Sequence, residues 1–116
     1  MNELFRLQVV FYKTHSGNEP VRDWLKCLPR NEKKIIGEDI KTVQFGWPLG
    51  MPLIRKVDTR LWEVRSQLDN RLARVIFTVH GNFMVLLHGF IKKSQKTPKG
   101  DLELAKKRAS EIRSQL

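Results

Sequence analysis

The spacing of apolar residues changes along the chain and separates strand-like segments from helix-like ones. Residues 7–12 read LQVVFY, a β-rich run that stops at the turn-forming residues 14–18. Apolar residues then recur at helical spacing in two segments, the first ending at Pro29 and the second reaching Gly46. The stretch from Gly46 to Pro52 holds two glycines and two prolines, so we expect a loop without regular structure there.

Beyond this loop, apolar and polar residues alternate with a period of two, which is typical of strands with one buried face. Two turns divide this part into three predicted antiparallel strands, at 61–65, 72–79 and 83–91. Helical spacing then returns, with one apolar face formed by Leu102, Ala105, Ala109, Ile112 and Leu116. The order strand, helix, helix, three antiparallel strands, helix predicts an α+β fold, with the helices packed on one face of the sheet. A chain of this length is expected to form a single domain, residues 1–116.

Alternation also assigns the strand side chains to two faces. Four residues should lie behind the helices: Trp62, Val64, Val75 and Phe77. Glu63, Arg65 and Arg74 should share the opposite face, which we expect to be open to solvent. An exposed pair between Glu63 and an arginine would be worth only a few tenths of a kcal/mol. Removing Arg74 should therefore leave the fold intact.

Positive charge is concentrated in the second part of the chain. The net charge of the 116 residues is +10. Residues 1–50 carry 8 Lys and Arg against 6 Asp and Glu, a net of +2, whereas residues 51–116 carry 14 against 6, a net of +8. Such focusing favours a polyanionic partner, either a nucleic acid or an acidic protein. The densest stretch is FIKKSQKTP at 90–98, where three lysines fall within five residues at the end of the last strand.

Several classes of site and location are not expected from this sequence. The single cysteine, Cys27, excludes an internal disulfide and a cysteine-based zinc cluster, and its neighbours Leu25 and Leu28 suggest a buried thiol. No His, Cys or carboxylate pair has ligand spacing and no phosphate-binding glycine loop occurs, so we expect neither metal nor cofactor. The longest apolar run, Phe83 to Leu87, is too short to span a bilayer, and no signal segment opens the chain. We expect a cytoplasmic protein with no membrane partner.

Four motifs together resemble the RelE/ParE toxin superfamily, and within it the HigB-type, phage-derived branch. They are NEPV at 18–21, LWEVR at 61–65, RVIF at 74–77 and HGFIKKSQKTP at 88–98. The similarity covers nearly the whole chain and includes the predicted order of elements, which implies a RelE-like fold. The resemblance implies the toxin of a type II toxin–antitoxin pair, a ribosome-dependent endoribonuclease that cuts messenger RNA and so inhibits translation.

The resemblance also implies site residues and partners. The positions that match the family's catalytic positions are Arg65, Arg74, Lys92 and Lys93, with Glu63 and His88 as further candidates. Contacts to RNA are expected at Lys56, Arg71, Phe90, Lys96 and Lys99. The implied partners are the ribosome, messenger RNA and a HigA-like helix-turn-helix antitoxin that covers part of the basic surface. Operator DNA would be bound only through that antitoxin.

The chemistry of RNA cleavage is compatible with this set of cations. A 2′-hydroxyl must lose a proton and attack in line, and fixed cations can stabilise the charge that builds on the phosphorane oxygens without a metal. Arg74 suits bidentate contact with phosphate, whereas a lysine acts as a point charge or a base. No tyrosine lies near the end of the last strand, so Phe90 or His88 would take the place that a tyrosine has in better-known members. Two alternatives stay open: a ParE-like poison of DNA gyrase, and a non-catalytic nucleic-acid-binding module.

Overall fold

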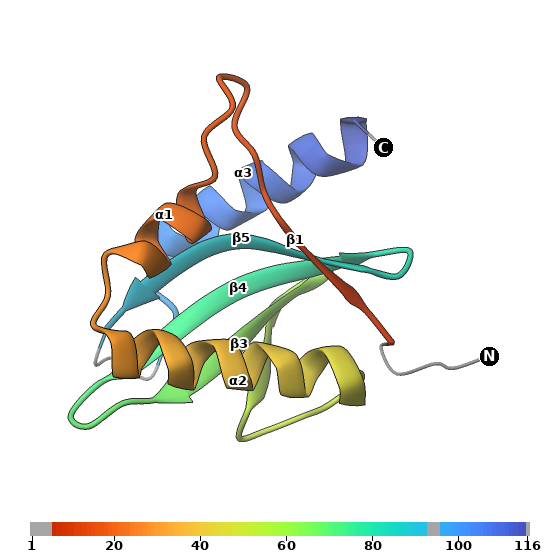
Figure 1. Ribbon diagram of the computed structural model, residues 1–116. Coiled ribbons are helices and arrows are strands. Elements are labelled where there is room, and N and C mark those ends of the chain that lie inside the picture. The colour runs from red at the N-terminus through yellow and green to blue at the C-terminus, as the bar shows by residue number, and fades with distance from the viewer. Residues whose placement is uncertain (1–5, 93–95, 116) are drawn as a thin grey trace.

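A mixed sheet with helices on both sides forms the framework of the protein (Figure 1). The computed structural model describes residues 6–92 and 96–115. Within these ranges the elements are β1 (Gln8–Phe11), α1 (Pro20–Lys26), α2 (Arg30–Gly46), β2 (Ile54–Asp58), β3 (Leu61–Gln67), β4 (Leu72–His80), β5 (Phe83–Ile91) and α3 (Lys99–Gln115). No helix in this described part of the chain is long and apolar enough to cross a membrane. The α+β class is confirmed.

The sheet contains one strand more than the sequence predicts. Its order is β1-β5-β4-β3-β2, with β1 parallel to β5 and the other neighbours antiparallel. The additional strand is β2, so the predicted run of three antiparallel strands is wrong by one. Its sequence, IRKVD, has three charged residues in five, which hides the apolar alternation. The turn that follows has no Asn-Gly or Asp-Gly signal and instead places Arg60 at a φ of 58°.

One face of the sheet carries the hydrophobic cluster that alternation predicts. Val64, Val75 and Phe77 are buried there beneath α1 and α2, and Trp62 packs against them. The ring of Trp62 lies 6.0 Å from that of Phe77, centroid to centroid, in a stacked arrangement. The predicted assignment of these four side chains to the helix-covered face is confirmed. Cys27 differs from expectation, since it follows the last residue of α1 and is exposed.

The opposite face of the sheet is also covered. Here Ile76 and Leu87 pack with Ala105 and Ala109 of α3 in a second cluster. Figure 1 shows α3 on the other side of the sheet from α1 and α2. The prediction that the helices share one face is therefore wrong. The reason is that β3, β4 and β5 present apolar residues on both faces, and α3 removes the second apolar surface from water.

A glycine in β5 allows α1 to pack closely on the sheet. A Cβ atom at Gly89 would lie 2.3 Å from Cε3 of Trp24 and 2.5 Å from its Cζ3. No carbon can approach so closely, so any side chain at this position must displace the indole ring. Glycine is thus required at position 89 by the packing of Trp24 rather than by backbone conformation.

The effect of Gly89→Ala on stability tests this packing. Forcing a methyl group into a filled site typically costs about 1–3 kcal/mol, so the free energy of unfolding should fall by that amount in urea denaturation. Gly37→Ala is the matched control, because a Cβ atom there meets nothing within 4 Å and alanine favours the helix. The control should be neutral or slightly stabilising. Equal effects of the two changes would contradict the packing.

Candidate active site

Two arginines face each other across the central strands. Arg65 of β3 is the direct partner of Arg74 of β4, so both side chains lie on the same face of the sheet, as alternation predicts. The face, however, is not open. Arg74 is fully buried, and the side chain of Arg65 is only 11% exposed. Arg74 donates a hydrogen bond from Nη1 to the backbone oxygen of Lys96, 3.3 Å away, which shows that the segment before α3 lies across it.

The carboxylate of Glu63 lies between these arginines and is itself fully buried. Its Oε1 is 3.7 Å from Nε of Arg74 and 3.9 Å from Nε of Arg65. The hydroxyl of Thr97 donates to the other oxygen, Oε2, at 3.0 Å. One buried carboxylate therefore contacts both cations and the chain segment that covers them. We call Glu63, Arg65 and Arg74 the charge cluster.

Burial changes what Arg74 contributes to the protein. Its desolvation lowers the pKa of Arg74, while the charge of Glu63 acts in the opposite direction. An arginine nevertheless stays protonated, because its ordinary pKa is so high. Taking one partner from a buried pair leaves an uncompensated charge, which typically costs about 3–5 kcal/mol. The predicted exposure of Arg74 is wrong, and we therefore now expect its removal to destabilise the fold.

The sheet brings a further cation to the charge cluster, one that the sequence analysis missed. Arg55 of β2 is the direct partner of Glu63, so its side chain lies on the same face. The positive charges of Arg65 and Arg55 both lower the pKa of Arg74, which places Arg55 within electrostatic reach. The sequence would have predicted the position of Arg55 only if IRKVD had been recognised as a strand, because the register of β2 against β3 places Arg55 opposite Glu63.

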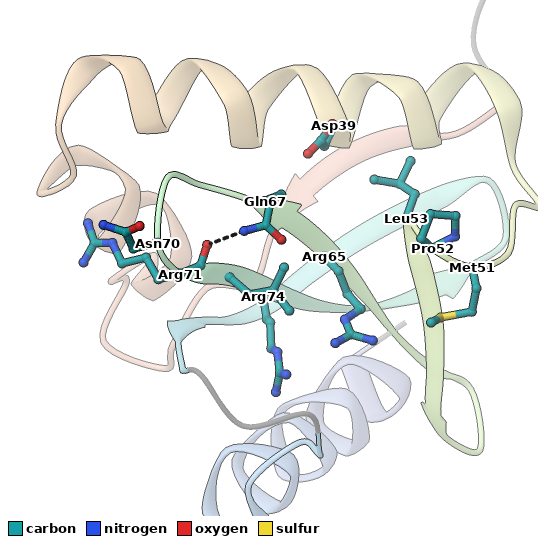
Figure 2. A pocket seen from close by; sticks show the side chains of 10 residues that line it. Asp39, Met51, Pro52, Leu53, Arg65, Gln67, Asn70, Arg71 and Arg74 are labelled. Carbon is teal, nitrogen blue, oxygen red and sulfur yellow. Dashed lines mark hydrogen bonds between the residues drawn. The ribbon is translucent and has the colours of Figure 1, made fainter.

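A cleft opens beside the charge cluster (Figure 2). β2 begins at Ile54, opposite Val64, so the last residues of β3 lie at an edge of the sheet, and the cleft opens along that edge. Its volume is about 700 Å³. Figure 2 shows the side chains of Arg65 and Arg74 pointing away from α2. The residues around the cleft are Asp39, Met51, Pro52, Leu53, Arg65, Gln67, Asn70, Arg71, Leu72 and Arg74.

Two of the predicted RNA contacts, Arg71 and Lys56, lie in different places. Arg71 lies in the β3–β4 turn at the cleft, where its Nη2 is 2.6 and 2.7 Å from the two carboxylate oxygens of Glu32. This hydrogen-bonded pair raises the pKa of Arg71. Lys56 is the strand partner of Trp62 and holds its ammonium 5.9 Å from the centre of that ring. It therefore lies on the α2 side of the sheet, away from the charge cluster.

A β-bulge brings His88 to the face of the charge cluster. The register of β4 and β5 shifts between Ile76 and Phe77, so that Ile76 pairs with His88 and one extra residue lies on β5. Nε2 of His88 is 2.6 Å from Oδ1 of Asp101 in α3, and its ring stacks on Phe90 at 5.4 Å. The pair ties the end of β5 to the first turn of α3.

Phe90 lies beneath Arg74 rather than at the surface. It is the strand partner of Arg74, and the guanidinium carbon is 5.8 Å from the ring centre. Only 6% of Phe90 is exposed, so its ring belongs to the core and packs against the charge cluster. A role in stacking on an RNA base does not fit this position.

The predicted lysines between the end of β5 and the start of α3 are Lys92, Lys93 and Lys96 of the FIKKSQKTP stretch, followed by Lys99. Lys92, Lys96 and Lys99 are all exposed, and they follow β5 or begin α3. Lys93 lies outside the described residues. These exposed lysines add positive charge to the segment between β5 and α3. The arginines of the charge cluster differ from them because they are almost completely buried.

The comparisons with known proteins identify a family. A family model described as phage derived protein Gp49-like matches residues 23–110. The matched range includes the charge cluster, Arg55 and the pair formed by His88 and Asp101. No curated protein matches the chain.

Proposed function

We propose that this chain, which belongs to the Gp49-like family of phage-derived proteins, is the toxin of a type II toxin–antitoxin pair. Membership of this family supports the assignment of the chain to the toxin superfamily, in agreement with the motifs at 61–65, 74–77 and 88–98. We assign the chain to the HigB-type branch. Its activity is that of a metal-independent endoribonuclease that cuts messenger RNA on the ribosome.

The observation that carries this proposal is the charge cluster at the wall of the cleft. A buried carboxylate holds two opposed arginines, and both border a cleft of about 700 Å³. Guanidinium groups fixed before substrate arrives stabilise developing negative charge without the cost of reorienting. The net charge of +8 on residues 51–116 adds a long-range attraction for the phosphates of RNA.

In the proposed reaction a 2′-hydroxyl of the RNA loses its proton and attacks the adjacent phosphorus in line. The O–P bond to the 5′-oxygen of the next nucleotide breaks, and that oxygen takes up a proton. The products are a 2′,3′-cyclic phosphate and a 5′-hydroxyl. Between reactants and products, negative charge builds on the phosphorane oxygens, and this is the charge that a fixed guanidinium stabilises.

The partly exposed arginine is the one that suits contact with RNA. The side chain of Arg65 is 11% exposed, whereas that of Arg74 is fully buried. We therefore assign the phosphate contact to Arg65 and treat Glu63 and Arg74 as positioning residues that hold it. Lys92, exposed at the end of β5, is a second cation available to the RNA backbone.

The proposed partners follow from the same surface. The ribosome would present messenger RNA to the cleft, and the antitoxin would be a helix-turn-helix protein with an acidic segment that covers part of the basic surface. Complementary charge of this kind speeds association and excludes wrong partners. Operator DNA would be bound through the antitoxin.

Two other functions make different predictions about Arg65. A gyrase poison would use the cations for protein contact and would leave RNA uncut. A nucleic-acid-binding module would tolerate Arg65→Lys, because a lysine keeps the charge and loses only the bidentate geometry. The burial of Arg65 against Glu63 favours a fixed, oriented group over a diffuse electrostatic surface.

Replacing Arg65 tests the proposed activity. Arg65→Ala should lower the rate of cleavage by on the order of a hundredfold or more, because a cation aimed at the transition state is lost. The measurement is primer extension on ribosome-bound messenger RNA. Arg22→Ala is the matched control, since Arg22 is an exposed arginine of α1 whose ion pair with Glu19 lies at the surface. The control should cut normally.

A normal rate for Arg65→Ala, with the fold verified by circular dichroism, would contradict the assignment of Arg65. Full activity of Arg65→Lys would contradict oriented catalysis and favour a binding module. Growth arrest without any RNA cleavage would favour the gyrase alternative.

Co-expression tests the proposed antitoxin. Expression of the chain alone should arrest growth, and expression together with a short neighbouring gene for a helix-turn-helix protein should restore it. The two proteins should also purify as one complex, and raising the salt concentration should weaken it, because screening reduces the attraction between their charges. A chain that is harmless alone would count against the toxin assignment.

A further inference from the structure

The polar groups around the cleft divide into cations and hydrogen-bond acceptors. Arg65 lies in the cation part, and Gln67 follows it two residues later on the same face of β3, about 7 Å along the strand. Asp39 of α2 contributes a carboxylate to the same cleft. Arg71 also borders the cleft beside Gln67, but its guanidinium is paired with Glu32. A ligand that spans the cleft would therefore meet the guanidinium of Arg65 at one end and the acceptors of Gln67 and Asp39 at the other.

The orientation of the Gln67 amide is set by its own neighbourhood. Its Nε2 donates to the backbone oxygen of Leu68 at 3.0 Å and to that of Arg71 at 3.4 Å. Both partners are carbonyl oxygens, so the amide nitrogen must face them and the amide oxygen must point elsewhere. Figure 2 shows the nitrogen of Gln67 turned to Arg71 and its oxygen turned away. The side chain is exposed, so this oxygen is available as an acceptor.

We infer that the cleft binds one RNA base beside the cleaved phosphate, and that Gln67 selects a base with an exocyclic amino group. This inference rests on the proposed function, because it takes Arg65 as the phosphate contact. Single-stranded RNA bases are commonly recognised by hydrogen bonds to their exposed edges.

The acceptors determine which bases fit. Adenine, cytosine and guanine each carry an amino group that can donate to Oε1 of Gln67 or to Asp39. Uracil has only one imino N–H, and it is flanked by two carbonyl oxygens that would be pressed against the acceptors. An unpaired acceptor buried by the bound base is the unfavourable outcome. The cleft should therefore discriminate against uracil.

The remaining walls of the cleft suit the flat faces of a base. Leu53 and Leu72 are half-buried beside it, and Met51 is 62% exposed at its mouth. Apolar side chains in this position can cover an aromatic ring while the polar groups read its edge. A flexible methionine adapts to purine and pyrimidine alike, so selection would come from hydrogen bonding rather than from size.

The test measures binding of short RNAs to the full chain. The probes are 2′-fluoro RNA pentamers of adenosine, cytidine and uridine, which lack the attacking hydroxyl, and binding is followed by fluorescence anisotropy at fixed salt. The wild-type chain should bind the adenosine and cytidine pentamers about three- to tenfold more tightly than uridine, the range expected for one neutral hydrogen bond. Gln67→Met should bring the three affinities within about twofold of one another.

Two further changes separate this inference from the proposed function. Gln8→Met makes the same chemical change at an exposed residue of β1, and it should keep the discrimination. Arg65→Ala should weaken all three pentamers about equally. Gln67→Ala serves as a second variant, and it should lose discrimination as Gln67→Met does.

Discrimination that survives both changes of Gln67 would overturn base selection, as would equal affinity of the wild-type chain for all pentamers. Either result leaves the proposed function standing if Arg65→Ala still weakens binding. Binding that is unaffected by Arg65→Ala would instead remove the phosphate contact. Absence of binding to every pentamer would overturn base selection by the free chain, whereas the proposed function is decided by the cleavage of ribosome-bound messenger RNA.

Discussion

The site depends on one buried carboxylate, that of Glu63. Its two oxygens contact Arg65, Arg74 and Thr97, so one side chain joins two strands to the segment that leads into α3. Removing these charges from water is costly, and the cost is offset only while all partners stay in place. The same constraint that could destabilise the fold thereby fixes the direction of the arginines. In the proposed function, a guanidinium held this way would stabilise a phosphate without the cost of reorienting.

The second helical layer makes this arrangement possible. α3 covers the face that carries the charge cluster, and the hydrogen bond between His88 and Asp101 joins the start of the helix to β5. Coverage lowers the local dielectric constant and strengthens each electrostatic interaction beneath. The cleft opens at the edge of the sheet where the last residues of β3 extend beyond the start of β2, and in the proposed function this is where RNA would enter. The burial of the charge cluster beneath α3 therefore serves both the stability of the fold and the proposed activity.

The sequence predicted side-chain positions correctly where apolar and polar residues alternate clearly, and it failed where charged residues or a bulge interrupt that alternation. Alternation assigned Val64, Val75 and Arg74 to the correct faces, because successive side chains of a strand point to opposite faces and the apolar ones fix the register. It failed for β2, where charged residues mask an edge strand, and so Arg55 was missed. It also could not show that α3 crosses to the far face, because the exposure of a strand face depends on the three-dimensional path of the chain. The position of His88 depends on a bulge, which inserts a residue without a sequence signal.

The central claim is that Glu63 and Arg74 form one energetic unit, and a double-mutant cycle on stability tests it most directly. The three variants are Glu63→Gln, Arg74→Gln and their combination, with the free energy of unfolding measured in urea at neutral pH. Each single change should destabilise the protein by several kcal/mol. The double variant should lose at least about 2 kcal/mol less than their sum, because the loss of the contact between Glu63 and Arg74 is counted in both single changes. Strictly additive effects would contradict the claim. They would show that Glu63 and Arg74 lie close together without stabilising one another.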